Sequence, residues 1–171
     1  MKHFLIISIL YIWSFADLAN FSSFEADFTQ TITDEKGTVL SYSGSLKALK
    51  PQFALWNYET PVEKRVYIQD KSVTVVEPEL EQVIIRRISN DFDFFTLIKN
   101  AKKIDKENYV ATFEESDIYI ELKDSKVLSL SYKDKFDNDV KILFSRQQHN
   151  KQISPSLFKA SYSQDYDIIT E

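Results

Sequence analysis

Residues 24–32 read FEADFTQTI, and this stretch decides the fold class because its apolar and polar side chains alternate. A repeat of two residues is the pattern of a β-strand with one apolar face. The stretch ends at DEKG, residues 34–37, which has the composition of a tight turn. The residues that share the apolar face are Phe24, Ala26, Phe28, Gln30 and Ile32.

The same rhythm continues on the far side of this turn and along most of the chain. The turns between the runs are short and polar, so neighbouring runs are expected to pair as antiparallel strands in a sheet, sandwich or barrel. The sequence therefore predicts a mainly β protein of about ten or eleven short strands in one domain. The further predicted strands are residues 39–49, 53–58, 65–69, 72–77, 80–88, 109–113, 118–122, 128–132, 140–144 and 157–162.

Residues 89–104, SNDFDFFTLIKNAKKI, break the β rhythm and predict a helix. Acidic residues come early and lysines late, which complements the helix dipole, and Asn90 or Asp91 is expected to cap the start. The apolar residues cover more than one stripe of such a helix. Two interpretations follow: a helix that plugs the open end of a sheet, or a lid over an apolar cavity.

The first sixteen residues have the pattern of a secretory signal peptide. A basic start, Met1-Lys2-His3, precedes the apolar run 4–13, FLIISILYIW, and small residues follow at Ser14 and Ala16. The apolar run is shorter than the roughly 20 residues that a membrane-spanning helix needs, although a permanent membrane anchor is the alternative. We therefore predict a signal peptide at 1–16 and one exported domain at 17–171.

The composition argues against several classes of function. There is no cysteine, only two glycines and a net charge of −5, which disfavours thiolate metal sites, phosphate-binding glycine loops and nucleic-acid binding. After removal of residues 1–16 the only histidine is His149, which is expected to be a surface residue. No pair of carboxylates stands out as a catalytic pair. We predict a binding protein that is not an enzyme and uses no metal and no cofactor.

Several motifs in the first half of the chain resemble the LolA family of periplasmic carriers of outer-membrane lipoproteins. They are Ser22-Ser23-Phe24-Glu25-Ala26-Asp27-Phe28-Thr29-Gln30, then Gly44 with Leu46, Lys50-Pro51, Trp56 with Tyr58, and Glu81-Gln82-Val83. Their order and spacing hold from Phe21 to Ile88. Residues 94–98 resemble the central lid helix of this family more loosely, and after about Asn108 only the strand rhythm is shared.

The resemblance implies a single incomplete antiparallel β-barrel closed by a helical lid, and the function of a periplasmic chaperone. Such a carrier, expected to be a monomer, binds the acyl chains of lipoproteins released by an inner-membrane ABC-type complex. It then delivers them to a LolB-like receptor in the outer membrane. The alternative is a sensory or regulatory domain on the same half-barrel fold.

The resemblance also implies a set of site residues. An acyl-chain cavity is expected at Phe24, Ala26, Phe28, Leu46, Ala54, Trp56 and Tyr58, with the lid formed by Phe92, Phe94, Phe95, Leu97 and Ile98. Lys50 stands where well-known members have an arginine that holds the lid closed. Three alternatives follow: Lys50 binds the lid more weakly, another contact closes the lid, or Lys50 is a solvated surface lysine. Asp93 replaces a proline that is common in relatives. These differences bear on lid geometry more than on the fold.

Overall fold

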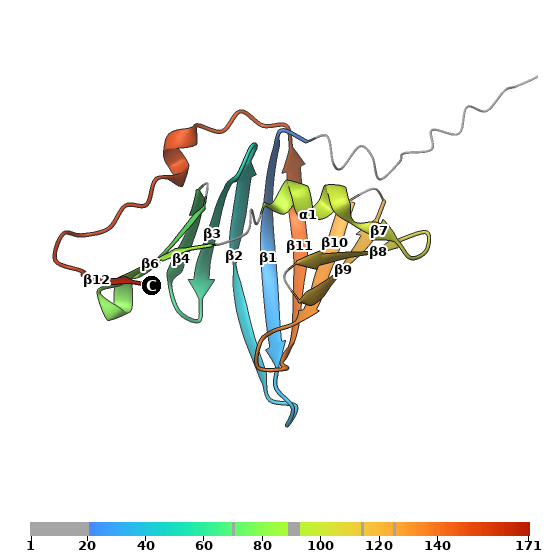
Figure 1. Ribbon diagram of the computed structural model, residues 1–171, viewed down its shortest axis with the longest axis horizontal. Helices are drawn as coiled ribbons and strands as arrows, with labels where there is room; N and C mark the ends of the chain where they lie inside the picture. The colour runs from blue at the N-terminus through green and yellow to red at the C-terminus, as the bar shows by residue number, and fades with distance from the viewer. Residues whose placement is uncertain (1–20, 70, 89–92, 114, 125) are drawn as a thin grey trace, which may run out of the picture.

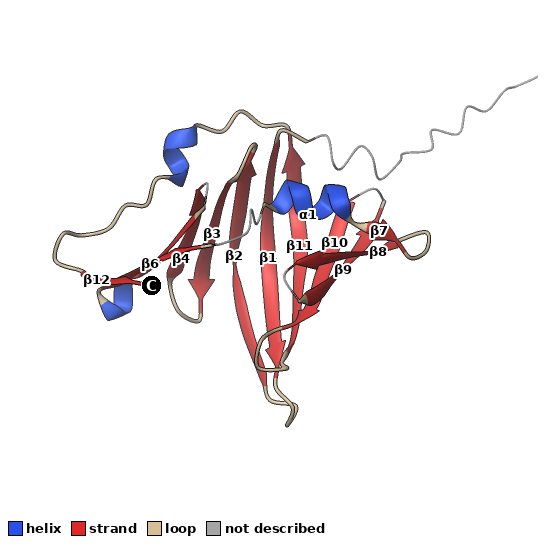
Figure 2. Cartoon of the chain, viewed as in Figure 1, coloured by secondary structure: helices blue, strands red, loops and turns tan. Residues whose placement is uncertain are grey.

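The computed structural model describes residues 21–69, 71–88, 93–113, 115–124 and 126–171. The predicted signal peptide lies outside these residues. One open sheet of twelve strands dominates the fold, with α1 lying across one face (Figures 1 and 2). The elements are β1 Ser23–Thr33, β2 Val39–Leu49, β3 Phe53–Thr60, β4 Lys64–Gln69, β5 Ser72–Glu77, η2 Pro78–Leu80, β6 Gln82–Arg87, α1 Phe94–Asn100, β7 Lys102–Lys103, β8 Asn108–Phe113, β9 Ser116–Lys123, β10 Lys126–Lys133, β11 Asp139–His149, η3 Pro155–Phe158 and β12 Asp167–Thr170.

Residues 24–32 lie in β1, at the centre of the sheet. All eleven residues of β1 pair with β2, from Ser23 opposite Leu49 to Thr33 opposite Val39, and β11 pairs along its other side. The predicted turn joins β1 to β2: the Asp34 carboxylate accepts hydrogen bonds from the backbone N–H groups of Lys36 (2.9 Å) and Thr38 (2.8 Å). Gly37 adopts φ of 80°, a conformation that glycine reaches without strain.

The order of the strands explains why a helix lies over the sheet. It runs β12-β6-β5-β4-β3-β2-β1-β11-β10-β9-β8-β7, so β2 to β6 extend to one edge and β7 to β11 return from the other. The segment between β6 and β7 must therefore cross the sheet, and it carries α1 over the face that we call the inner face. The segment between β11 and β12 crosses the opposite, outer face and places Phe158 against Phe53 of β3, with ring centroids 5.5 Å apart.

The prediction of an incomplete antiparallel barrel is confirmed as a single open sheet, with twelve strands where ten or eleven were expected. The strand predicted at 157–162 is wrong: Pro155 begins η3, and Phe158 of η3 is fully buried on the outer face. The two strands that the sequence did not predict are short edge strands. Lys102–Lys103 forms β7 beside β8, and Asp167–Thr170 forms β12 parallel to β6.

The predicted helix is shorter than residues 89–104, because it begins at Phe94 and ends at Asn100. The predicted caps Asn90 and Asp91 lie outside the described residues, and the observed cap is Asp93. The lysines at 102 and 103 pair with Tyr109 and Val110 as β7, so they cannot continue the helix.

Candidate functional site

The inner face of the sheet forms one continuous apolar surface shared by both halves of the chain. Strand alternation places Phe24 and Phe28 of β1 there, together with Ile120 of β9 and Phe144 of β11. Five of the seven predicted cavity residues are buried in this surface, and Trp56 and Tyr58 are half-buried against it. The five buried ones are Phe24, Ala26, Phe28, Leu46 and Ala54.

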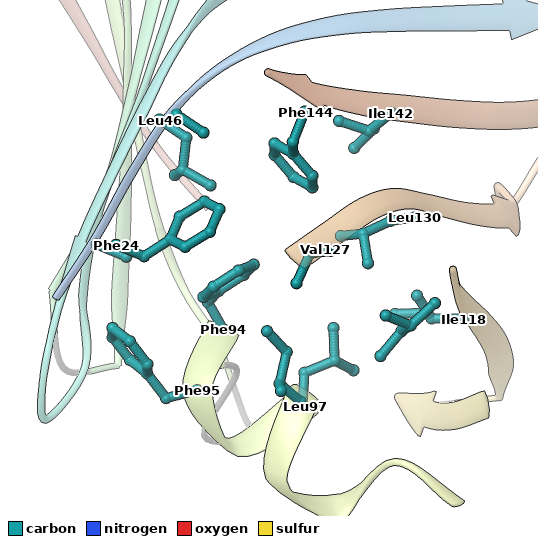
Figure 3. Packing of buried hydrophobic residues seen from close by; sticks show 14 of the residues in the cluster. Phe24, Leu46, Phe94, Phe95, Leu97, Ile118, Val127, Leu130, Ile142 and Phe144 are labelled. Atoms are coloured by element: carbon teal, nitrogen blue, oxygen red, sulfur yellow. The ribbon is translucent and has the colours of Figure 1, made fainter. Parts of the chain in front are cut away.

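Short helix α1 covers this surface with four of the residues predicted to form the lid. Phe94, Phe95, Leu97 and Ile98 are all buried, whereas Phe92 lies outside the described residues. The Phe94 ring lies 4.8 Å from the Phe24 ring and 6.5 Å from that of Phe144, measured between centroids. Figure 3 shows the side chains of Phe94 and Leu97 pointing from α1 into the space between the strands.

Asp93 caps α1 at its start. One carboxylate oxygen accepts a hydrogen bond from the backbone N–H of Phe95 at 3.1 Å, and the other accepts from the N–H of Thr96 at 3.0 Å and from its hydroxyl at 2.8 Å. Asp93 is buried, so these bonds satisfy a carboxylate that would otherwise be costly to remove from water. Asp93 thus defines where this helix begins.

The expected cavity beneath the helix is not open in this structure. The side chains of α1 fill the space, and a cavity of about 30 Å³ remains beside Ala54, Trp56, Phe94, Leu97 and Leu130. That volume is close to the share of one water molecule in the liquid, about 30 Å³. Sites for small molecules usually enclose roughly 300–1,000 Å³. An acyl chain therefore fits on the inner face only after α1 has moved away.

Lys50, predicted to gate the lid, lies beside α1. Its Nζ atom is 5.4 Å from the centroid of the Phe95 ring, within the range of a cation–π contact. Its backbone N–H donates to the carbonyl oxygen of Ser22 at 3.0 Å, which fixes the β2–β3 connection against the start of β1. The lysine is thus in contact with the helix that it was expected to hold, through an aromatic ring.

A side-chain hydrogen bond that the sequence did not predict lies on the same face, farther along β1. The Tyr58 hydroxyl donates to the side-chain oxygen of Gln30 at 2.9 Å, and both residues are at least half-buried. Tyr42 and Tyr132 lie nearby: the Tyr42 and Tyr58 rings are 6.0 Å apart, and Tyr132 packs against the apolar cluster. Burial, together with the neighbouring Tyr132 and Tyr42, raises the pKa of Tyr58, so this phenol stays a neutral hydrogen-bond donor.

Comparison with known proteins decides the family. The profile described as "Outer membrane lipoprotein carrier protein LolA" matches residues 19–161. The chain belongs to the LolA family. An outer-membrane lipoprotein carrier protein from Campylobacter jejuni is 41% identical over 168 residues, with 98% of each chain covered. The protein of the same name from Wolinella succinogenes is 34% identical over 158 residues, with 91% of each chain covered.

Solved structures with little sequence similarity share the fold. A LolA superfamily protein from Nitrosomonas europaea aligns with a TM-score of 0.54 at 8% identity, covering 85% of this chain and 96% of that one. An uncharacterized conserved protein from Thermus thermophilus aligns with a TM-score of 0.56 at 12% identity, covering 92% and 97%. These likenesses support the open-sheet architecture of the LolA family and nothing more specific.

Membership in the LolA family, whose description names a carrier, confirms the prediction that the chain is not an enzyme. The histidine expected at the surface is half-buried: the His149 ring stacks on Phe21 with centroids 3.9 Å apart. Burial, with a smaller contribution from Lys126, lowers the pKa of His149. Within the described parts of the chain, no cluster of three or more His, Asp or Glu side chains is arranged to hold a metal ion, and no helix is long and apolar enough to cross a membrane.

The cap of α1 offers a direct test of how firmly this helix is held. Replacing Asp93 with Ala removes the acceptors at its first turn, which costs about 1 kcal/mol. We expect an apolar fluorescent dye to bind the variant about fivefold more tightly in titrations, because the inner face is uncovered more often. Asp134→Ala is the matched control, since Asp134 also accepts two backbone N–H bonds but lies in the β10–β11 turn. Equal dye affinity in both variants would argue that α1 does not control access.

Proposed function

We propose that the protein is a periplasmic carrier that shields the acyl chains of lipoproteins and delivers the lipoproteins to the outer membrane. The names of its relatives, outer-membrane lipoprotein carrier proteins, support this function. The proposed acyl-chain surface comprises the seven predicted cavity residues, with α1 as the lid and Lys50 as one of the contacts that hold it. The signal peptide at 1–16 would direct the domain at 17–171 to the periplasm.

The observation that carries the proposal is that α1 fills the inner face with side chains chemically similar to an acyl chain. Burying one such side chain stabilises by about 1.5–3 kcal/mol, so the four together contribute roughly 6–12 kcal/mol. A chain of roughly sixteen carbons gains on the order of 10 kcal/mol when its methylenes leave water. These magnitudes are similar, so an acyl chain can replace α1 on the sheet without a large net change in free energy.

The proposed partners follow from the two steps of carriage, release from the inner membrane and delivery to the outer membrane. A lipoprotein must be lifted out of the inner membrane, and an ABC-type release complex would supply the energy for that step. Delivery requires an acceptor that binds the acyl chains more tightly, for which a LolB-like receptor in the outer membrane is the proposed partner. The carrier itself would act as a monomer, since a single sheet provides a complete inner face.

The test is release of an acylated lipoprotein from spheroplasts by the purified protein. Wild-type protein should bring the lipoprotein into the soluble fraction as a complex. Trp56→Glu should lower the released amount more than tenfold, because a carboxylate among acyl chains would be removed from water without a partner. Leu80→Glu is the control: Leu80 is 63% exposed on η2, so its replacement should leave release unchanged.

Circular dichroism should show the same β-rich spectrum for both variants. Full release by Trp56→Glu would mean that Trp56 does not contact the cargo. A wild-type protein that binds apolar dye but releases no lipoprotein would contradict the carrier function, and would favour a sensory domain on the same fold.

A further inference from the structure

The apolar inner face carries a small group of polar side chains at a distance from α1. Phe24, which contacts Phe94 of α1, and Gln30 are both on β1, six residues apart. At a rise of 3.3–3.4 Å per residue this separation is about 20 Å. Gln30 pairs with Tyr42 across the β1–β2 ladder, and Tyr58 reaches the same place from β3. We call Gln30, Tyr42, Tyr58 and Tyr132 the tyrosine cluster.

The tyrosine cluster holds more hydrogen-bond donors than its own contacts use. The bond from Tyr58 occupies the side-chain oxygen of Gln30, which still has the two N–H groups of its amide. Among the described residues, no hydrogen bond involves this amide nitrogen or the hydroxyls of Tyr42 and Tyr132. Lys64 adds a positive charge at the rim, with Nζ 4.5 Å from the centroid of the Tyr58 ring. The cluster thus offers donors to a group that accepts hydrogen bonds.

The acyl chains of a lipoprotein end in acceptors of this kind. Each chain is attached through an ester or amide group, and its carbonyl oxygen accepts hydrogen bonds. A carbonyl buried without a donor is costly, so a site that buries acyl chains up to their attachment needs donors there. A chain of roughly sixteen carbons extends about 20 Å, since each C–C bond of about 1.5 Å advances an extended zigzag chain by about 1.25 Å. Its carbonyl would therefore reach the tyrosine cluster when its methyl end lies beneath α1.

We infer that the tyrosine cluster binds the ester and amide carbonyls that join the acyl chains to the lipoprotein, and so distinguishes diacylglyceryl-modified cargo from plain hydrocarbon. This inference rests on the proposed carrier function and specifies the cargo of the same site. The apolar inner face supplies most of the affinity, and the donors of the tyrosine cluster set the position of the chains along the sheet.

The test compares two synthetic lipopeptides of equal chain length. One carries S-(2,3-diacyloxypropyl)cysteine with ester-linked chains, and the other carries the dialkyl ether analogue, which lacks the carbonyls. Displacement of an apolar dye, below the concentration at which the peptides aggregate, gives both dissociation constants. Wild-type protein should bind the ester form about tenfold more tightly than the ether form, as expected from the loss of two or three neutral hydrogen bonds.

Two variants and a control assign the preference to the cluster. The double variant Gln30→Leu, Tyr58→Phe removes both partners of one hydrogen bond, so it should retain the fold. This variant and Tyr132→Phe should each lower the ester-to-ether preference, the double variant to within about twofold of unity. Tyr119→Phe should keep the full preference, since Tyr119 is 52% exposed on the outer face.

The outcomes separate the inference from the proposed function. Equal binding of ester and ether forms by wild-type protein would overturn the role of the tyrosine cluster and leave the carrier function intact. A preference that persists in both cluster variants would place carbonyl recognition elsewhere and would also overturn the inference. Failure of wild-type protein to bind either lipopeptide would overturn the inference together with the carrier function.

Discussion

Phe94→Ala should bind acyl chains more tightly than the wild-type protein while being less stable to heat. Phe94 is the residue of α1 that packs against rings from both halves of the sheet, Phe24 and Phe144. Truncating a buried Phe to Ala costs about 3–5 kcal/mol. If α1 is the lid that we propose, it leaves the sheet by itself, so most of this cost falls on the closed state and the open state becomes more populated.

We expect the affinity for an apolar dye or a diacylated peptide to increase at least tenfold in fluorescence titrations, and the thermal midpoint to fall by several degrees. Phe136→Ala is the control, because Phe136 is 70% exposed in the β10–β11 turn. A loss of stability without any gain in affinity would show that α1 is a fixed plug of the core. That result would decide between the two interpretations of residues 89–104.

Gly44→Ala should be among the most destabilising single substitutions in the sheet. A Cβ atom at Gly44 would lie 1.9 Å from the carbonyl oxygen of Asn57 and 3.0 Å from the Cα of Tyr58. Both atoms belong to the backbone of β3, so no side-chain rotation can relieve the clash. The pairing register of β2 with β3 shifts between Ser43 and Gly44, and this irregularity brings the two backbones together.

The variant must separate β2 from β3, and overpacking of this kind costs about 3 kcal/mol or more. For a domain of this size each kcal/mol lowers the thermal midpoint by roughly 2–4 °C, so a decrease of about 6–12 °C is expected in calorimetry. Ser41→Ala, at an exposed position of β2, should change the midpoint by less than about 2 °C. A midpoint of Gly44→Ala equal to that of the control would contradict the close approach of the two strands.

The fold was predictable because the strand pattern is local. Alternation of side chains identified ten of the twelve strands, and polar turns such as residues 34–37 fixed their antiparallel pairing. The two missed strands carry no such pattern: Lys102–Lys103 is too short to alternate, and every residue of Asp167–Thr170 is exposed at the edge of the sheet, so neither face is buried. Their pairing depends on the neighbouring strand, which a local pattern cannot reveal.

The candidate site was predictable only in part. The inner-face residues of the first half followed from alternation and from the family motifs, and the four buried residues of α1 were identified by their apolar character. The burial of Asp93 was not predicted because it depends on where the helix begins. The bond between Gln30 and Tyr58 was not predicted because folding brings these residues together from separate strands. Nor could the sequence show that α1 itself occupies the cavity.

The two connections that cross the sheet have different mechanical roles. In the proposed function, the one on the inner face moves when cargo enters. The one on the outer face joins β11 to β12 and is anchored by the buried ring of Phe158 against Phe53. We therefore expect it to restrain the sheet from flattening if α1 moves away, so that the curvature of the proposed acyl-chain surface would persist.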